Sequence, residues 1–420
     1  MTSRGLWVRW SWRDLRGRWV LVAAISLVIA LGTGTYAALL GTSAWRRASN
    51  DASFALLNTH DVRVRLNQGT TVTEGRLAAL VATIPSAASV QDVSERLVVP
   101  TQVSAPKDVL VPGELVGSET GAGRGVDDVW PAAGRLPTAA DDGQAVVVLD
   151  RQFAEANQLP AGGEVVLSGG ARARYVGFGQ QPEYFLSSGG QGGLPFLSQK
   201  SFAVVFATLH TAQALTGASG QVNDVVLTLR QGVPTGASPA MTSAEPPADQ
   251  VAEELRAALA ATRPAVSAVV TTRGELPSYR VLYDDIDGDA QLWRIVALLV
   301  LCGAAFAALN LTARIVEAQR REIGIGMALG VRPAVLAVRP LLFGMQVALI
   351  GVVLGVVVGR LVSIPLKAVF VDMLPLPVWL TPFQVGIYLQ AAALGFVLPL
   401  AAVAWPVWRA VRVQPVEAIR

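Results

Sequence analysis

Four long stretches without a charged residue divide the chain and predict membrane-spanning helices. They cover residues 19–45, 295–313, 340–359 and 385–405. A helix needs about 20 apolar residues to cross the ~30 Å hydrocarbon core of a bilayer. A charged residue at the centre of such a helix costs roughly 2.5–3.5 kcal/mol on insertion scales, so uncharged stretches of this length are informative. The pattern predicts an α-helical membrane protein with four transmembrane helices.

The segments that flank these stretches differ in charge. Residues 1–18, 314–339 and 406–420 together hold 13 arginines and 4 acidic residues, whereas the loop 360–384 has a net charge of +1. Because short cytoplasmic segments carry an excess of Lys and Arg, we expect the three basic segments in the cytoplasm. Both termini are then cytoplasmic, and the loop 360–384 lies on the opposite side of the membrane.

Residues 46–294 form one long insert between the first and second stretches, with 19 basic and 26 acidic residues. Polar and apolar residues alternate over Asp61–Leu66, which predicts a half-buried strand, whereas Glu74–Ile84 has helical spacing. The insert is therefore predicted to be a large, mixed α/β extracytoplasmic domain. Its other expected elements are strands at 89–99, 145–149, 164–167, 222–229 and 266–272, and helices at 153–159 and 248–262.

The order of these elements suggests two subdomains. Two strand–helix–strand pieces, about 50–105 and 221–280, would form one discontinuous subdomain, and a β-rich subdomain, about 106–220, would be inserted into it. The aromatic residues of the Gly/Ser-rich loop 180–197 either contact a substrate or fix the loop to its own domain, and we favour the second. Residues 231–249 are too polar to bury a core and are expected to be a linker.

Composition changes this picture little but excludes several functions. The chain is 52% apolar and 15% charged, and it has one cysteine and two histidines. We find no phosphate-binding P-loop and no G-x-S-x-G nucleophile motif. The acidic run 284–289 does not fit a calcium loop, because Tyr283 and Arg294 fall at ligand positions, and we interpret it as a solvated hinge. We predict no catalytic residue, no metal site, no enzymatic activity and no nucleic-acid partner.

The first uncharged stretch has a second interpretation. Thr42-Ser43-Ala44 resembles a signal-peptide cleavage site, and the preceding arginines resemble the basic start of a signal peptide. The stretch is about twice as long as an ordinary signal-peptide core, so we favour a retained transmembrane helix. In either case residues 46–294 lie outside the cytoplasm.

The most specific segment lies between the second and third stretches and reads EAQRREIGIGMALGVR, from Glu317 to Arg332. Its charged residues come first and an apolar patch follows, with Gly330 as a plausible helix cap before Pro333. Taken alone, this pattern fits a short cytoplasmic helix. A basic loop that happens to be helical is the alternative.

The order of residues in this segment resembles the signature R-E-I-G…A-L-G of FtsX/MacB-type ABC transporter permeases, the type VII group. Arg321-Glu322-Ile323-Gly324 is followed by Ala328-Leu329-Gly330. The C-terminal segment 408–420 is similar to the closing pattern of that family, and residues 12–19 resemble its amphipathic helix at the cytoplasmic membrane face, within residues 1–18. One span, a large external domain and three further spans also match the topology of the family.

This resemblance implies that residues 314–339 carry a coupling helix that docks on a separate cytoplasmic ABC ATP-binding subunit. The apolar patch would anchor the helix in a groove, and the charges at its rim would set the register. The contact residues implied are Glu317, Arg320, Arg321, Glu322, Ile323, Gly324, Met327 and Leu329. ATP and Mg would be bound by that partner and no cofactor by this chain, which would lie in the bacterial plasma membrane among its lipids.

Gly351, Gly355 and Gly359 recur every four residues in the third stretch and predict a helix-packing face. Glycines at this spacing lie on one side of a helix and permit close approach of another. Either a second permease copy, giving a homo- or heterodimer, or another helix of the same chain is expected on this face.

The resemblance implies a permease subunit that transmits ATP-driven movement to the external domain, for export or extraction of a lipid, lipoprotein, peptide or antibiotic. Two alternatives remain at this point. An FtsX-like regulator of a cell-wall hydrolase has the same membrane architecture with a smaller external domain, and a sensor of antimicrobial peptides is compatible with the same sequence.

Overall fold

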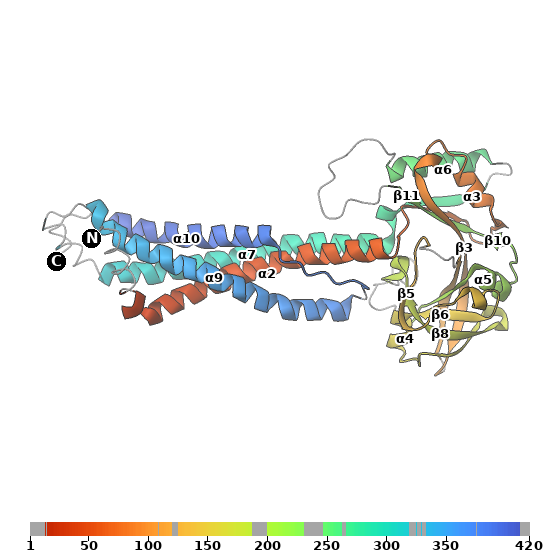
Figure 1. The fold of residues 1–420 in the computed structure, drawn as a ribbon, viewed down its shortest axis with the longest axis horizontal. Helices are drawn as coiled ribbons and strands as arrows, with labels where there is room; N and C mark the ends of the chain where they lie inside the picture. Colours follow the sequence, from red (N-terminus) through yellow and green to blue (C-terminus); the bar gives the residue numbers. More distant parts are fainter. Residues whose placement is uncertain are drawn as a thin grey trace. The chain divides into compact units, whose positions relative to one another are not determined.

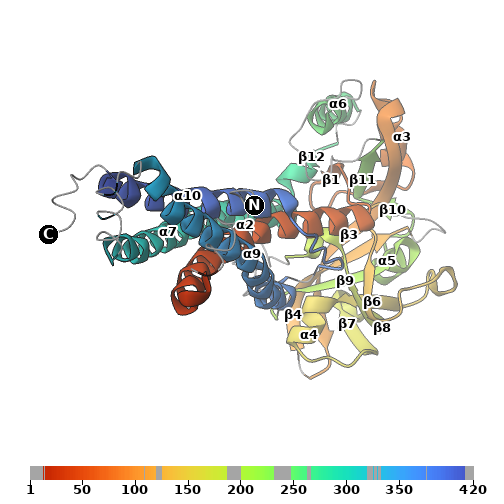
Figure 2. The same ribbon diagram turned by 60° about the vertical axis from the view of Figure 1, so that its left-hand side comes forward.

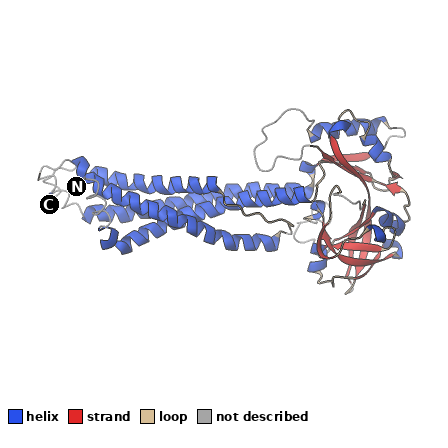
Figure 3. Cartoon of the chain, in the orientation of Figure 1, coloured by secondary structure: helices blue, strands red, loops and turns tan. Residues whose placement is uncertain are grey.

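The computed structural model describes residues 13, 15–107, 109–119, 125–186, 200–230, 247–262, 266–318, 325, 329, 333–374 and 376–411. The chain divides into two compact units, each described here by itself. We call Met1–Arg46, Ile286–Met373 and Thr381–Arg420 the helical unit, and Arg47–Asp285 with Leu374–Leu380 the sheet unit. Figure 3 shows helices as blue and strands as red ribbons, and the strands belong to the sheet unit.

All four uncharged stretches are helical. They lie within α2 (Trp19–Leu56), α7 (Pro277–Ala318), α9 (Pro333–Met373) and α10 (Val385–Val411), labelled in Figure 1. Three described helices are long and apolar enough to cross a membrane, namely Trp19–Leu56, Pro277–Ala307 and Leu341–Met373, and α10 contributes a shorter apolar helix, Val385–Ala401. The helical unit is thus that of a membrane protein, and the crossing by α10 stays a prediction.

Large apolar side chains on the outside of the helical unit agree with a lipid surrounding. Leu299 and Phe306 on α7 and Val353 on α9 are exposed, whereas Ile29 on α2 and Ala348 on α9 are buried between helices. Outward-facing apolar residues are unfavourable in water and favourable in a bilayer, where the backbone polar groups of a helix are satisfied internally.

The helices extend well beyond the uncharged stretches, and one expectation fails for that reason. The acidic run 284–289 is not a hinge, because α7 continues through it without interruption. Asp289 is stabilised in the helix by an ion pair with Arg46, at 2.6 Å between Nη1 and Oδ2. The charges near the ends of the spans are partly paired with each other, so they do not mark the ends of the helices.

The sheet unit contains a ten-stranded sheet with two lobes. In the helix-covered lobe, α3 (Arg76–Val81) and α6 (Ala248–Ala261) lie beside antiparallel strands of the sheet, as Figure 2 shows. Val64, Val225 and Leu255 belong to the apolar core between them. The strands of this lobe are β12 (Ala268–Thr272), β1 (Val62–Leu66), β11 (Asp224–Leu229) and the first half of β3 (Val90–Ala105), and a separate pair joins β2 (Val72–Thr73) to β10 (Gln221–Val222).

In the barrel lobe, six strands pair in a closed ring, in the order β3, β4, β9, β6, β8, β7 and back to β3. Closure removes exposed strand edges, and apolar side chains such as Val147, Val165 and Tyr175 fill the interior. α4 (Arg151–Ala156) and α5 (Leu209–Thr216) pack on this lobe. The additional strands are β4 (Val109–Ser118), β5 (Trp130–Gly134), β6 (Val146–Asp150), β7 (Gly163–Leu167), β8 (Arg172–Gln180) and β9 (Ala203–Thr208).

The strand β3 belongs to both lobes. Its residues from Val90 to Arg96 pair with β11, and its residues from Arg96 to Ala105 pair with β4. The expected subdomain boundary near residue 105 therefore lies at the turn between two strands that are paired over ten positions. The division into two subdomains stays a prediction, and the backbone pairing makes the two lobes one continuous sheet.

Candidate functional site

The segment expected to couple to an ATPase lies largely outside the described residues. This holds for Arg320, Arg321, Glu322, Ile323, Gly324 and Met327, while the backbone of Glu317 lies in the last turn of α7. Ile325 and Leu329 are described and exposed, and the Leu329 N–H donates to the Ile325 carbonyl at 3.0 Å. The two residues present apolar side chains to the surroundings.

The glycine face of α9 packs on α2 of the same chain. A Cβ atom on Gly351 would lie 2.7 Å from the Ile29 Cβ, and one on Gly355 would lie 2.1 Å from the Thr33 Oγ1. A Cβ on Gly359 would meet the Tyr388 hydroxyl at 2.9 Å. Gly351 and Gly355 therefore permit the close approach of α9 to α2, and Gly359 permits the approach of Tyr388 on α10. The neighbour on this face is intrachain.

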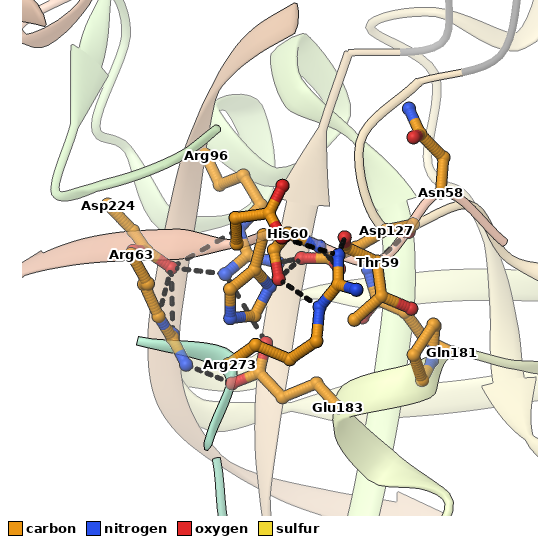
Figure 4. Close-up of polar contacts among 12 residues, drawn as sticks. Asn58, Thr59, His60, Arg63, Arg96, Asp127, Gln181, Glu183, Asp224 and Arg273 are labelled. Atoms are coloured by element: carbon orange, nitrogen blue, oxygen red, sulfur yellow. Dashed lines mark hydrogen bonds and ion pairs between the residues drawn. The ribbon is translucent and has the colours of Figure 1, made fainter. Parts of the chain in front are cut away.

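A buried ion network occupies the face of the sheet opposite α3 and α6 (Figure 4). We use this name for His60, Arg63, Arg96, Asp127, Glu183 and Asp224. The alternation of β1 explains the placement, because Val62, Val64 and Leu66 enter the apolar core and Arg63 takes the other face. The expectation of a half-buried strand is wrong for β1, since Arg63 is only 7% exposed.

Asp224 is the centre of this network. It lies directly opposite Arg96 in the β11–β3 pairing. Arg96 donates from Nη2 to the Asp224 Oδ2 at 2.7 Å, and Arg63 donates from Nη2 to the same oxygen at 2.7 Å. Glu183, in the 3-10 helix η4 (Pro182–Tyr184), completes the network by pairing with both arginines. Charge-assisted bonds of this kind are roughly twice as strong as neutral ones.

Asp127 joins the network to His60. Its Oδ2 accepts from the Arg96 Nη1 at 3.0 Å and lies 2.7 Å from the His60 Nδ1, and its Oδ1 accepts from the His60 backbone N–H at 3.0 Å. The backbone of Asp127 has a φ of 56°, in the left-handed region that a non-glycine residue adopts only when its contacts compensate. These three contacts hold the loop at residues 125–130 against β1 and β3.

The electrostatics favour the ionised forms of Asp224 and Asp127. Burial raises the pKa of Asp224, but the charges and hydrogen bonds of Arg63 and Arg96 outweigh it and lower that pKa to about 2. Burial opposes ionisation of Asp127 in the same way, while His60 and Arg96 hold its pKa well below the usual range. Each buried charge is thus stabilised by opposite charges on other segments.

The network connects to the ends of two long helices within the sheet unit. Residues 47–56 of α2 and 277–285 of α7 belong to this unit. The Ser278 hydroxyl on α7 donates to the Pro182 carbonyl at 3.0 Å, next to Glu183. Arg273, just before α7, donates from Nε to the His60 carbonyl at 2.9 Å and pairs with Asp61. The start of α7 is therefore attached to both sides of the network.

The end of α2 is fixed by aromatic and polar contacts. The Phe54 ring lies 5.1 Å from the Tyr279 ring on α7 and 5.4 Å from the Phe185 ring. The Ser49 hydroxyl donates to the Leu380 carbonyl at 3.1 Å and accepts from the Leu380 N–H at 3.0 Å. Phe185 belongs to residues 180–186, the described part of the loop 180–197, and it fixes that part to its own domain, as we favoured; residues 187–197 lie outside the described part of the chain.

Sequence patterns had no signal for this network beyond the alternation of β1. Arg63 is 120 residues from Glu183 and 161 residues from Asp224. Among the residues that the structure describes, no group of three or more His, Cys, Asp or Glu side chains is arranged to hold a metal ion. Every carboxylate of the ion network forms an ion pair with an arginine. The network is therefore suited to holding together the segments that carry these residues.

Comparison with known proteins gives a family match and a similarity to a solved structure. Residues 294–415 match the family described as FtsX-like permease C-terminal. None of the curated proteins matches this sequence. Among solved structures, the chain is similar to the periplasmic region of MacB from Actinobacillus actinomycetemcomitans, with 13% sequence identity, coverage of 56% of this chain and 95% of that chain, and a TM-score of 0.33.

Proposed function

We propose that this chain is an FtsX-like permease of an ABC transporter and that it transmits ATP-driven movement from a separate cytoplasmic ATPase to its sheet unit. The match of residues 294–415 to the FtsX-like permease C-terminal family supports this proposal. The match is the observation that carries the proposal. It includes most of α7, all of α9 and the segment 319–332 between them, where the R-E-I-G…A-L-G residues lie.

The proposed topology has four spans with both termini in the cytoplasm of a bacterium, and the sheet unit and the loop 374–384 outside. The excess of arginine in residues 1–18, 314–339 and 406–420 supports this orientation. Residues 1–12 and 412–420 lie outside the described part of the chain.

The continuous helices α2 and α7 support the proposal that movement is transmitted along the chain. Each has residues in both units, with 38 residues in α2 and 42 in α7. A helix with an unbroken hydrogen-bond ladder transmits displacement along its axis, and these two end in the contacts of Phe54, Tyr279, Ser278 and Arg273. Movement at the cytoplasmic ends would reach the ion network through these residues.

We propose that a partner subunit binds ATP and Mg and that this chain has no enzymatic activity of its own. Two permease chains would pair in the complex, through surfaces other than the glycine face of α9, because α2 occupies that face. The cargo would be a lipid, lipoprotein, peptide or antibiotic that the sheet unit receives or moves outside the membrane.

The coupling role is tested by removing charge from the segment 319–332. Alanine at Arg320, Arg321 and Glu322 should abolish copurification of the ATPase, because these residues set the rim of the proposed helix-in-groove contact. Alanine at Arg9, Arg13 and Asp14 removes two arginines and one acid from another proposed cytoplasmic segment and should leave copurification intact. Full retention of the ATPase by the first variant would show that the coupling assignment is wrong.

A further inference from the structure

A cavity of about 70 Å³ lies within the helical unit, between α2, α9 and the start of α10. The residues from α9 are Arg360, Ser363, Ile364 and Lys367, whose spacing of three, four and seven positions puts them on one helical face. The volume is small enough for one compact polar group and too small for a drug-sized ligand.

The lining of this cavity is basic and rich in hydrogen-bond donors. Arg360 and Lys367 contribute two positive charges, and Ser363, Thr381 and Gln384 contribute hydroxyl and amide groups. No carboxylate lines the cavity, and in the described part of the chain neither cation has a carboxylate within ion-pair distance. A group with negative charge and several acceptor oxygens fits this lining, and an ammonium group would meet two like charges.

The position of the cavity along α9 indicates where such an anion comes from. The uncharged residues 340–359 span about 30 Å as a helix, the thickness of a hydrocarbon core, and Arg360 follows directly. Lys367 lies two turns further, about 10 Å beyond, at the depth of phospholipid headgroups. Trp45 lines the same cavity, and tryptophan side chains concentrate at this depth.

Apolar surface continues from the cavity onto the outside of α9. Leu361 and Ile364 are exposed large apolar residues beside Arg360. A phospholipid has a phosphate joined to acyl chains, so one molecule can place its phosphate between the two cations and its chains along these residues. Free phosphate would use the cations and leave this apolar surface uncovered.

We propose that the cavity binds the phosphate group of an anionic phospholipid, with Arg360 and Lys367 as the cationic contacts and Thr381 and Gln384 as hydrogen-bond donors. The assignment to the outer leaflet rests on the topology given under the proposed function. The binding chemistry does not depend on the ATPase. Positive residues are uncommon near that side of a membrane, and a specific ligand accounts for these two, which lie in the last part of α9.

The experiment titrates the full-length chain, purified in nonionic detergent and stripped of lipid, with dioleoyl-phosphatidylglycerol or dioleoyl-phosphatidylcholine, and measures occupancy by native mass spectrometry. We expect phosphatidylglycerol to bind at least about tenfold more tightly. A basic residue near an anionic membrane surface contributes about 1 kcal/mol, which is about fivefold in affinity. Arg360→Gln and Lys367→Gln should therefore each weaken phosphatidylglycerol binding about fivefold, and the double variant about 25-fold.

The matched control is Arg294→Gln, which removes an exposed arginine of α7 in the same unit but outside the cavity. It should leave phosphatidylglycerol binding unchanged. Arg360→Lys with Lys367→Arg keeps both charges and should retain binding, which separates loss of a ligand contact from loss of fold.

Three results would overturn the proposal: equal binding of the two lipids, an equal loss in Arg294→Gln, or displacement of phosphatidylglycerol by inorganic phosphate at millimolar concentration. The last would identify a site for free phosphate. Copurification of the ATPase should be unaffected by Arg360→Gln and Lys367→Gln, and the coupling variant should still bind lipid. Failure of the proposed function and failure of this inference are therefore separate outcomes.

Discussion

Arg46 on α2 and Asp289 on α7 form an ion pair of 2.6 Å across 243 residues of sequence. The Arg46 side chain is 1% exposed, and its guanidinium also lies 4.3 Å from the centre of the Phe370 ring on α9. Three helices of the helical unit thus meet at one arginine, at the end of the uncharged part of α2.

We expect the pair to couple the stabilities of α2 and α7. In a double-mutant cycle of Arg46→Gln and Asp289→Asn, the interaction energy should be about 1–3 kcal/mol, because one partner is fully buried. The measurement is chemical unfolding of the full chain in mild detergent. The control cycle uses Arg280 and Asp284, an exposed pair at 3.7 Å in the same helix, for which at most about 0.5 kcal/mol is expected. Equal values for the two cycles would contradict the prediction.

Removing one cation from the ion network should destabilise the sheet unit strongly. Arg96→Met keeps the length of the side chain but removes the one cation that pairs with both Asp127 and Asp224, and such a change costs about 3–5 kcal/mol. Hydrogen exchange of the β11 backbone amides reports the loss. Arg172→Met, which removes an exposed ion pair on β8, should cost less than about 1 kcal/mol. Unchanged β11 exchange in Arg96→Met would refute the prediction.

The lowered pKa of Asp224 predicts a loss of stability in acid. Its pKa is about 2 in the folded protein and near 3.9 when unfolded, so the unfolded chain binds the proton first as the pH falls. The contribution is complete above about pH 4 and is lost towards pH 2, and it amounts to about 2–3 kcal/mol. Denaturant unfolding followed over this range should show the loss, and Asp224→Asn should show a weaker pH dependence there. If the free energy of unfolding of the wild-type protein did not change between pH 4 and pH 2, the prediction would be wrong.

The contact between α9 and α2 predicts that adding a single carbon atom to a glycine at this contact destabilises the protein. Gly355→Ala puts a Cβ 2.1 Å from the Thr33 Oγ1, and overpacking of this kind costs about 1–3 kcal/mol. Gly303→Ala on α7 places its Cβ in open space and should be neutral or stabilising by up to about 1 kcal/mol, from helix propensity. Thermal unfolding in detergent compares the two variants, and equal melting temperatures would contradict the tight packing described.

Patterns in the sequence predicted the helices better than their ends. Hydrocarbon excludes unpaired charge, so the uncharged stretches located α2, α7, α9 and α10. The same reasoning stopped the first span near Trp45 and interpreted residues 284–289 as a hinge, because Arg46 and Asp289 were taken as solvated. In the structure they pair with each other, and both helices continue.

In the sheet unit, the alternation of Asp61–Leu66 predicted β1 and its apolar face but not the burial of its polar face. From sequence alone, the polar face of a strand is expected to contact water. Asp224 and Glu183, which bury Arg63, come close to it only in the tertiary structure. The coupling segment was found through its resemblance to a family and not through physical reasoning, and most of it lies outside the described residues.

The strand β3 has 16 residues and is about 50 Å long at ~3.3 Å per residue. Paired neighbours line it in both lobes, because residues near its start pair with β11 and residues near its end pair with β7. One continuous strand therefore joins the helix-covered lobe to the barrel lobe without a flexible linker between them.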